Sequence, residues 1–385
     1  MIILTKHKLE TSQTMELNKQ SQSAGDNSTQ MQATTINNYY STISGIDEAR
    51  ARDICKEEFA VACQNWTQEA IIIAEQRVHQ LEDRLMPKMV AFDKTLSFFG
   101  DPAFQFTLRQ AQISAASSDR ESDYEMLSKL LLHRIEQGDN LDRRLGVCKA
   151  IEIVNQVTEE ALIGLTMVYV VTKFIPVSNN VNESLSVLDG LYGKILDGNK
   201  LPIDNGWMEN LDLLSAIRLG VQSVNKFKKF DEYIPMRLKK YLVSGIDENS
   251  EEFRELRNEF IKVGLPTNCF VQHGLIPDFV KLSVDDEIDK IHIDLRCENG
   301  SILTVPMSEE QKNALSKAIT LLRKDESAND GIKKVLMEKW DEHPNLKIVK
   351  DWWNSLPVHF SITPAGVALA NAYAQSKEPS IPGLY

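Results

Sequence analysis

Apolar residues recur at helical spacing along most of this chain, and that spacing limits the folds it can adopt. Between residues 70 and 85 they follow one another in steps of three and four, which places them on one face of a long helix. Pro87 is expected to end or kink this helix. Side chains typical of helix N-caps precede this and other periodic segments: Asp47, Thr67, Asp101, Ser122 and Thr158. The sequence therefore predicts a mainly α protein, with a run of helices up to about residue 264 and one of them at about 207–219.

The pattern changes after Pro266. Segments 279–284, 291–296 and 301–305 have the composition of strands, and Asn299-Gly300 between the last two is typical of a hairpin turn. Ser308 followed by Glu309–Gln311 predicts a helix start, and further short helices are expected around 331–342 and 345–354. Thr363 with Pro364 predicts a final capped helix after a short strand. These elements together indicate a small α+β C-terminal domain.

The domain organisation that follows has five parts. We expect a disordered extension over 1–18, a polar β tract over 19–45 and a long helix pair over 46–100. A helical domain over 101–264 and the α+β domain over 265–385 complete the chain. Met1 and Met15 both remain open as the natural start.

Residues 19–45 form the most unusual segment, with many Ser, Thr, Asn and Gln residues and only Lys19 and Asp26 charged. Polar and other residues alternate between 30 and 35, which is typical of a short strand. Rows of Gln and Asn side chains can form hydrogen-bonded ladders when several chains meet in register. A disordered tail is the alternative that this composition also fits. The candidate residues for self-association are Asn27, Gln30, Gln32, Ile36, Asn37 and Tyr39.

A basic stretch interrupts the acidic chain between residues 226 and 240, where six basic residues stand against Asp231 and Glu232. The whole chain has a net charge of −12, so only such a local positive field would hold a polyanion. Phe227, Phe230 and Tyr233 are interleaved, and aromatic side chains among cations suit phosphate and base contacts. The other interpretation is a helix that buries its aromatic residues and leaves its cations in water. The candidate phosphate or nucleic-acid residues are Lys226, Lys228, Lys229, Arg237, Lys239 and Lys240.

Motifs with recognised chemistry are missing from the sequence. It has no HExxH, no phosphate-binding GxxxxGK[ST] and no GxSxG, and its histidines do not cluster with cysteines, so we expect no metal site and no cofactor. The five cysteines include no CxxC pair, which fits reduced thiols in the cytoplasm, and no apolar run approaches the length of a membrane span. A cluster of carboxylates between Asp119 and Glu125 would serve a metal-dependent nuclease only if distant residues joined it.

The segment Lys19–Ala33, followed by the helical segment Ala49–Met86, resembles the start of a widespread family of uncharacterised bacterial proteins. Members of that family begin with Lys-Gln, continue with a Gly-Asp-Asn-Ser-x-Asn/Gln-x-Gln-Ala tract and follow it with a helix pair rich in Ala, Glu and Arg. Asp101–Gln112, the helix opening Ser122–Arg134 and the end at 361–372 are also similar. The resemblance implies no activity or catalytic residue. It suggests a setting in bacterial signalling or antiviral defence, because similar tracts precede such proteins.

These observations favour a non-enzymatic, self-associating interaction or sensor protein, with a setting in bacterial antiphage defence. We expect a homo-oligomer, with room for a protein partner and no membrane. The alternative is a nucleic-acid-directed protein, either a binder that uses residues 226–240 or a metal-dependent nuclease. The two differ in their salt dependence, because phosphate contacts release counterions and self-association through uncharged side chains does not.

Overall fold

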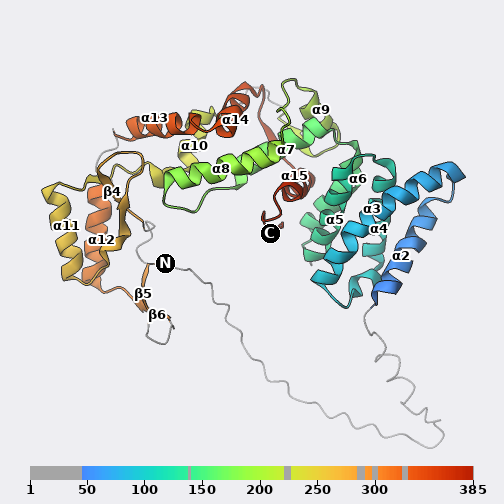
Figure 1. Cartoon of the computed structure of the whole chain (residues 1–385), viewed down its shortest axis with the longest axis horizontal. Helices are drawn as coiled ribbons and strands as arrows, with labels where there is room; N and C mark the ends of the chain where they lie inside the picture. The colour runs from blue at the N-terminus through green and yellow to red at the C-terminus, as the bar shows by residue number, and fades with distance from the viewer. Residues whose placement is uncertain are drawn as a thin grey trace, which may run out of the picture.

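A computed structural model describes residues 46–137, 140–220, 227–283, 291–296, 302–322 and 328–384. Within these ranges the protein is mainly α, with fourteen α-helices and a few short antiparallel sheets, as the sequence predicts. Figure 1 shows an arch: helices α2 to α6 form one end, α11 and α12 form the other, and α7, α8, α13 and α14 span the distance between them.

The first helices are α2 (Glu48–Ala62), α3 (Gln68–Phe92) and α4 (Pro102–Ser117), with the short 3-10 helix η1 (Ser97–Gly100) before α4. The predicted caps are confirmed. The side chains of Asp47, Thr67 and Asp101 each accept a hydrogen bond from a backbone N–H in the first turn of the helix that follows. Helix α3 continues through Pro87 to Phe92, so of the two expected outcomes an end at Pro87 is wrong, and a kink there stays a prediction. Its apolar stripe extends past the proline, and Met86 and Met89 are both buried.

The next helices are α5 (Glu121–Glu136), α6 (Leu141–Ile153) and α7 (Glu159–Lys173), with η2 (Val154–Gln156) between the last two. Helix α5 begins at Glu121, earlier than the predicted cap Ser122, because Asp123 turns back to accept hydrogen bonds from Ser118 and Arg120. The final helix α15 (Pro364–Lys377) packs against α5, α6 and α7. Its predicted cap Thr363 is confirmed by the bond from the Gly366 N–H.

Helix α8 (Val181–Leu196) is followed by α9 (Gly206–Leu213), which ends well before the predicted residue 219. Ser215 adopts a left-handed backbone with φ of 61°, which stops the helix. Residues Ile217–Leu219 then form strand β1 and pair antiparallel with β7 (Phe360–Ile362). Helices α10 (Phe230–Arg237), α13 (Ala328–Asp341) and α14 (Pro344–Ser355) pack together, with η3 (Lys239–Tyr241) after α10.

The other end of the arch is a small α/β unit. Strands β2 (Ile246–Asp247), β4 (Phe279–Leu282) and β3 (Phe270–Gln272) form an antiparallel sheet in that order, with η4 (Thr267–Cys269) before β3. Helices α11 (Glu251–Lys262) and α12 (Glu309–Leu322) pack on each other beside it. Strands β5 (His292–Arg296) and β6 (Ile302–Pro306) pair antiparallel, as the hairpin prediction requires, although the turn itself lies outside the described residues.

Two hydrophobic clusters hold these elements together. The larger cluster contains buried residues from Ala51 to Leu242, together with Leu275 and the buried residues from Ile332 to Ile381. The smaller cluster consists of Leu256, Phe260, Leu265, Met307, Ala314, Leu315, Ala318 and Leu322. Apolar contacts therefore group residues 332–381 with the N-terminal and middle helices. The domain boundary expected at 264/265 stays a prediction, but the C-terminal strand β7 and helix α15 belong to the large core.

Candidate functional site

The first predicted site falls outside the described part of the chain. Asn27, Gln30, Gln32, Ile36, Asn37 and Tyr39 all lie within residues 1–45, so their role in self-association stays a prediction. Lys226 of the second predicted site is also outside the described residues.

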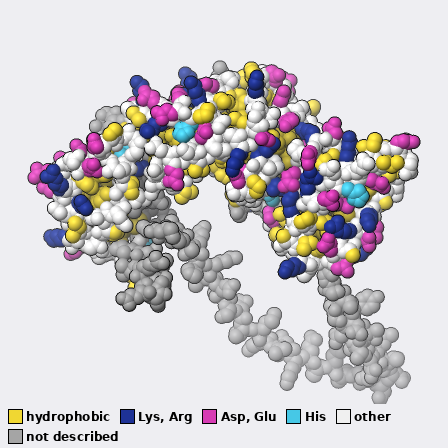
Figure 2. Space-filling model, in the orientation of Figure 1, with side chains coloured by type: hydrophobic (Ala, Val, Ile, Leu, Met, Phe, Trp, Pro, Cys, Tyr) yellow, Lys and Arg dark blue, Asp and Glu magenta, His cyan; other side chains and the backbone are white. Residues whose placement is uncertain are grey.

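The remaining cations of the basic stretch surround helix α10. Lys228, Lys229 and Lys239 are exposed, and Arg237 is half-buried. The Lys240 Nζ donates a hydrogen bond to the carbonyl oxygen of Pro176 at 2.7 Å. On the face shown in Figure 2, basic and acidic side chains are interspersed over the surface and do not gather into one broad basic area.

The aromatic residues of the same stretch are packed inside. Phe230 and Tyr241 have no exposed surface, and Phe227 and Tyr233 lie against the indole ring of Trp353 with ring centroids 4.8 and 5.2 Å apart. The Trp353 Nε1–H donates to the carbonyl oxygen of Lys228 at 2.9 Å, which fixes the start of α10 against α14. These rings stabilise the core, so a base could not stack on the buried Phe230 or Tyr241 in this conformation. The role of the exposed cations in binding stays a prediction.

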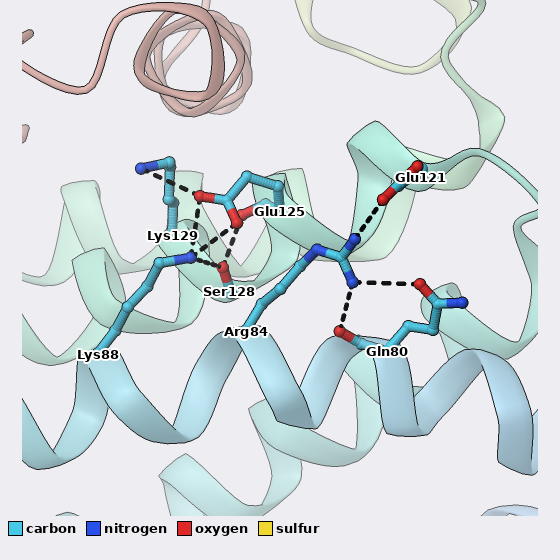
Figure 3. A network of polar contacts seen from close by, with 7 residues as sticks. All are labelled: Gln80, Arg84, Lys88, Glu121, Glu125, Ser128 and Lys129. Atoms are coloured by element: carbon cyan, nitrogen blue, oxygen red, sulfur yellow. Dashed lines mark hydrogen bonds and ion pairs between the residues drawn. The ribbon is translucent and has the colours of Figure 1, made fainter.

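The carboxylates between 119 and 125 form part of a structural network between α3 and α5 (Figure 3). Glu125 accepts two hydrogen bonds from Lys88, each of 2.9 Å, and lies 3.3 Å from the Lys129 amine. Glu121 accepts one from Arg84 at 2.6 Å. Asp123 is paired with Arg120. Because Glu121, Asp123 and Glu125 each already have a basic partner, these three carboxylates stabilise the packing of the fold and offer no ready ligand set for a metal.

A second observation about metals comes from the whole described chain. Within the ranges that the structure describes, no three His, Cys, Asp or Glu side chains come together in a way that could hold a metal ion. His133 is buried at 2% exposure, and burial lowers its pKa to about 4. The imidazole is therefore neutral and packed, as its position on an apolar helix predicts.

An open groove lies between α2 and α3, a location that the sequence did not predict as a site. Both helices pack against α4 and diverge from their connection, as Figure 1 shows. The space between them has a volume of about 550 Å³. Its lining combines apolar side chains with the exposed polar groups of Lys56, Glu75 and His79 and the buried carboxyl of Glu82. The lining residues are Lys56, Phe59, Ala60, Cys63, Ile71, Glu75, Val78, His79 and Glu82. Concave sites of this size with a few polar groups are typical of ligand or partner binding.

Glu82 is the buried acid of this groove, with 7% of its surface exposed. Burial raises the pKa of its carboxyl, and the positive groups around it, led by His79, oppose that rise. The His79 Nδ1 lies 3.7 Å from the Glu82 Oε2. The side chain of Gln112 is next to the carboxyl, and its Nε2–H donates to the Cys55 carbonyl oxygen at 2.9 Å. A protonated Glu82 is therefore better suited to this position than a carboxylate.

Two isoleucines of α3 differ in their relation to the groove. Ile72 and Ile73 are 51% and 52% exposed. Ile72 lies one and two turns before the groove residues Glu75 and His79, so it is at the groove rim. Ile73 lies one turn before Arg77, whose Nη1 donates to the Ala116 carbonyl oxygen on the other side of α3. Only Ile72 therefore extends the apolar surface of the groove.

Comparison with known proteins gives a family and no activity. No curated protein and no solved structure matches the chain. Among the described residues, no helix is long and apolar enough to cross a membrane. One protein-family model, of an uncharacterised-like family, matches residues 45–381 and so begins where the polar tract ends. Because this match covers most of the 385 residues, the chain belongs to that uncharacterised-like family.

Proposed function

We propose that this protein is a self-associating interaction or sensor protein that assembles through residues 19–45. The observation that carries the proposal is the nearly uncharged, alternating Gln, Asn and Thr pattern of this tract, which leads directly into α2. Such side chains gain hydrogen bonds when copies of the same segment stack in register, and one chain supplies only one copy. Several chains must then meet.

The groove between α2 and α3 supports the same function. Helices α2 and α3 leave apolar surface open to solvent, and α2 is the first helix after the tract. Exposed apolar surface with a polar rim is a common mark of a protein interface. The resemblance to bacterial proteins with the same opening tract suggests a setting in antiphage defence, which is the finer part of this proposal.

The test is a deletion of residues 1–44 in the full-length protein. We expect native mass spectrometry to show an oligomer for the complete chain and a lower mass for the truncated one, because the truncation removes every candidate ladder residue. Removal of residues 1–14 alone is the matched control, and it should leave the oligomer intact because the tract begins at Lys19. A monomeric complete chain, or an oligomer unchanged by the longer deletion, would show that the proposal is wrong.

A further inference from the structure

The groove between α2 and α3 carries a positive and a negative side chain at similar distances from the connection between the two helices. Seven residues separate Lys56 from Cys63 on α2, and eight separate Thr67 from Glu75 on α3. At a rise of about 1.5 Å per residue, the two side chains start about 10 and about 12 Å from the connection between the helices. Both line the groove. A cation and an anion therefore lie level with each other on its opposite walls.

Neither charge has a strong ion-pair partner among the residues that the structure describes. Lys56 lies 3.7 Å from Asp53 in an exposed pair, a contact that contributes little to stability. Glu75 has no ion pair among the described residues. Both are exposed, and Ile72 completes the rim beside them with half of its surface in water. The rim thus combines an apolar anchor with an unused pair of opposite charges.

We infer that the occupant of this groove is the same surface of a second copy of this chain. The inference rests on the self-association proposed above and assigns it a second interface. When two copies are related by a two-fold axis that runs along the groove between the two diverging helices, α2 of one copy faces α3 of the other. Lys56 of each copy then meets Glu75 of the other at the same level, twice per dimer. The result is a four-helix bundle that covers Ile72, Phe59 and Ile71.

Charge complementarity favours a second copy over another occupant. The exposed cation Lys56 and the exposed anion Glu75 lie at equal distances from the helix connection, so this pair complements its own copy under a two-fold axis, whereas a polyanion would be repelled by Glu75. The parallel arrangement also places the two starts of α2 at the same end of the bundle. Ile46 of each copy then lies at the same end of the assembly, so the two copies of the preceding tract start from one end.

The first test compares Ile72→Gln with Ile73→Gln in the full-length protein. The two residues have the same side chain, helix and exposure, and only Ile72 borders the groove. We expect I72Q to raise the dissociation constant of the dimer by about tenfold or more, because each dimer loses two buried isoleucines. I73Q should leave it unchanged. Sedimentation equilibrium measures both, and equal behaviour of the two variants would overturn the inference.

The second test exchanges the charges. Lys56→Glu and Glu75→Lys should each weaken the dimer because they place like charges opposite each other, and the double variant should restore it. The control is the double exchange Lys334→Glu with Glu338→Lys, an exposed pair on α13 that should have no effect. A double variant no better than either single one would refute the Lys56–Glu75 contact.

The outcomes separate this inference from the proposed function. If deletion of residues 1–44 leaves the dimer intact while I72Q dissociates it, the role of the tract fails and the groove interface stands. If the deletion dissociates the oligomer and I72Q does not, the groove inference fails and the proposed function stands. If neither change lowers the mass, or if the complete chain is monomeric, both are wrong.

Discussion

Replacing Gly366 by alanine should destabilise the protein because α15 begins in contact with the backbone of the segment before β1. A Cβ at Gly366 would lie 2.0 Å from the Ala216 carbonyl oxygen and 2.8 Å from the Ile362 Cγ2, whereas ordinary contacts begin at 3.4 Å. The same carbonyl accepts hydrogen bonds from the Thr363 N–H at 3.0 Å and from its hydroxyl at 2.9 Å. The helix cannot move away without weakening these bonds and the β1–β7 pairing.

The magnitude follows from these contacts. Overpacking of this kind costs about 1–3 kcal/mol, and a weakened hydrogen bond adds about 1 kcal/mol, while alanine returns about 1 kcal/mol through its helix propensity. We therefore expect G366A to lose about 1–3 kcal/mol in the free energy of unfolding.

Gly190 of α8 is the matched control, since a Cβ there meets no atom within 4 Å. G190A should gain about 0.5–1 kcal/mol because only the helix propensity changes. Urea unfolding followed by circular dichroism measures both variants. If G366A proves as stable as the wild type, or if both variants shift in the same direction, the close contact at Ala216 is not present in solution.

Two further predictions concern a helix start and the acid of the groove. Asp189 of α8 accepts hydrogen bonds from the N–H groups of Asn345 and Leu346 at 2.9 and 3.2 Å, and so caps α14 from a distant part of the chain. D189A should therefore lower the free energy of unfolding by about 1–2 kcal/mol in a urea titration. A change under about 0.3 kcal/mol would show that this cap is not used. Burial raises the pKa of Glu82, so its contribution to stability is present at acidic pH and is lost as the pH rises through the raised pKa. E82Q should therefore melt at a higher temperature than the wild type at pH 8 and at the same temperature near pH 4. A difference in melting temperature that grows towards acidic pH would contradict this reasoning.

Local signals account for most of the helices, because capping depends on neighbouring residues. Asp47 and Thr67 cap through a backbone N–H three residues ahead, and Ser308 and Gln311 exchange the reciprocal bonds of a capping box at 3.2 and 3.0 Å. Local capping residues do not predict the end of α9. Residues up to 219 fit a helix by composition, but β1 forms because Ile217 finds its partner Ile362 at the other end of the chain. Pairing over that distance leaves no local pattern.

The candidate sites show the same limit. The sequence identified the cations and aromatic residues of 226–240, but Trp353 and Trp340, which bury Phe230, lie more than a hundred residues away. The groove also has no signature in the sequence. Its walls read as ordinary amphipathic helices, and the space opens only because α4 takes up the faces that α2 and α3 would otherwise present to each other. The one local hint is Ile72, an apolar residue on the otherwise charged and polar outer face of α3.

The proposed tract and groove interfaces would depend on each other for energetic reasons. A ladder of uncharged side chains gains little from two chains alone, because each chain pays the conformational entropy of ordering its own segment. A bundle of α2 and α3 would hold two tracts at one end, which raises the concentration of each tract around the other to the millimolar range typical of short linkers. The groove carries charged groups beside its apolar lining, so a contact through it would gain from the tracts in turn. Under these two proposals, self-association would be a cooperative property of residues 19–92, in which neither interface needs to be strong.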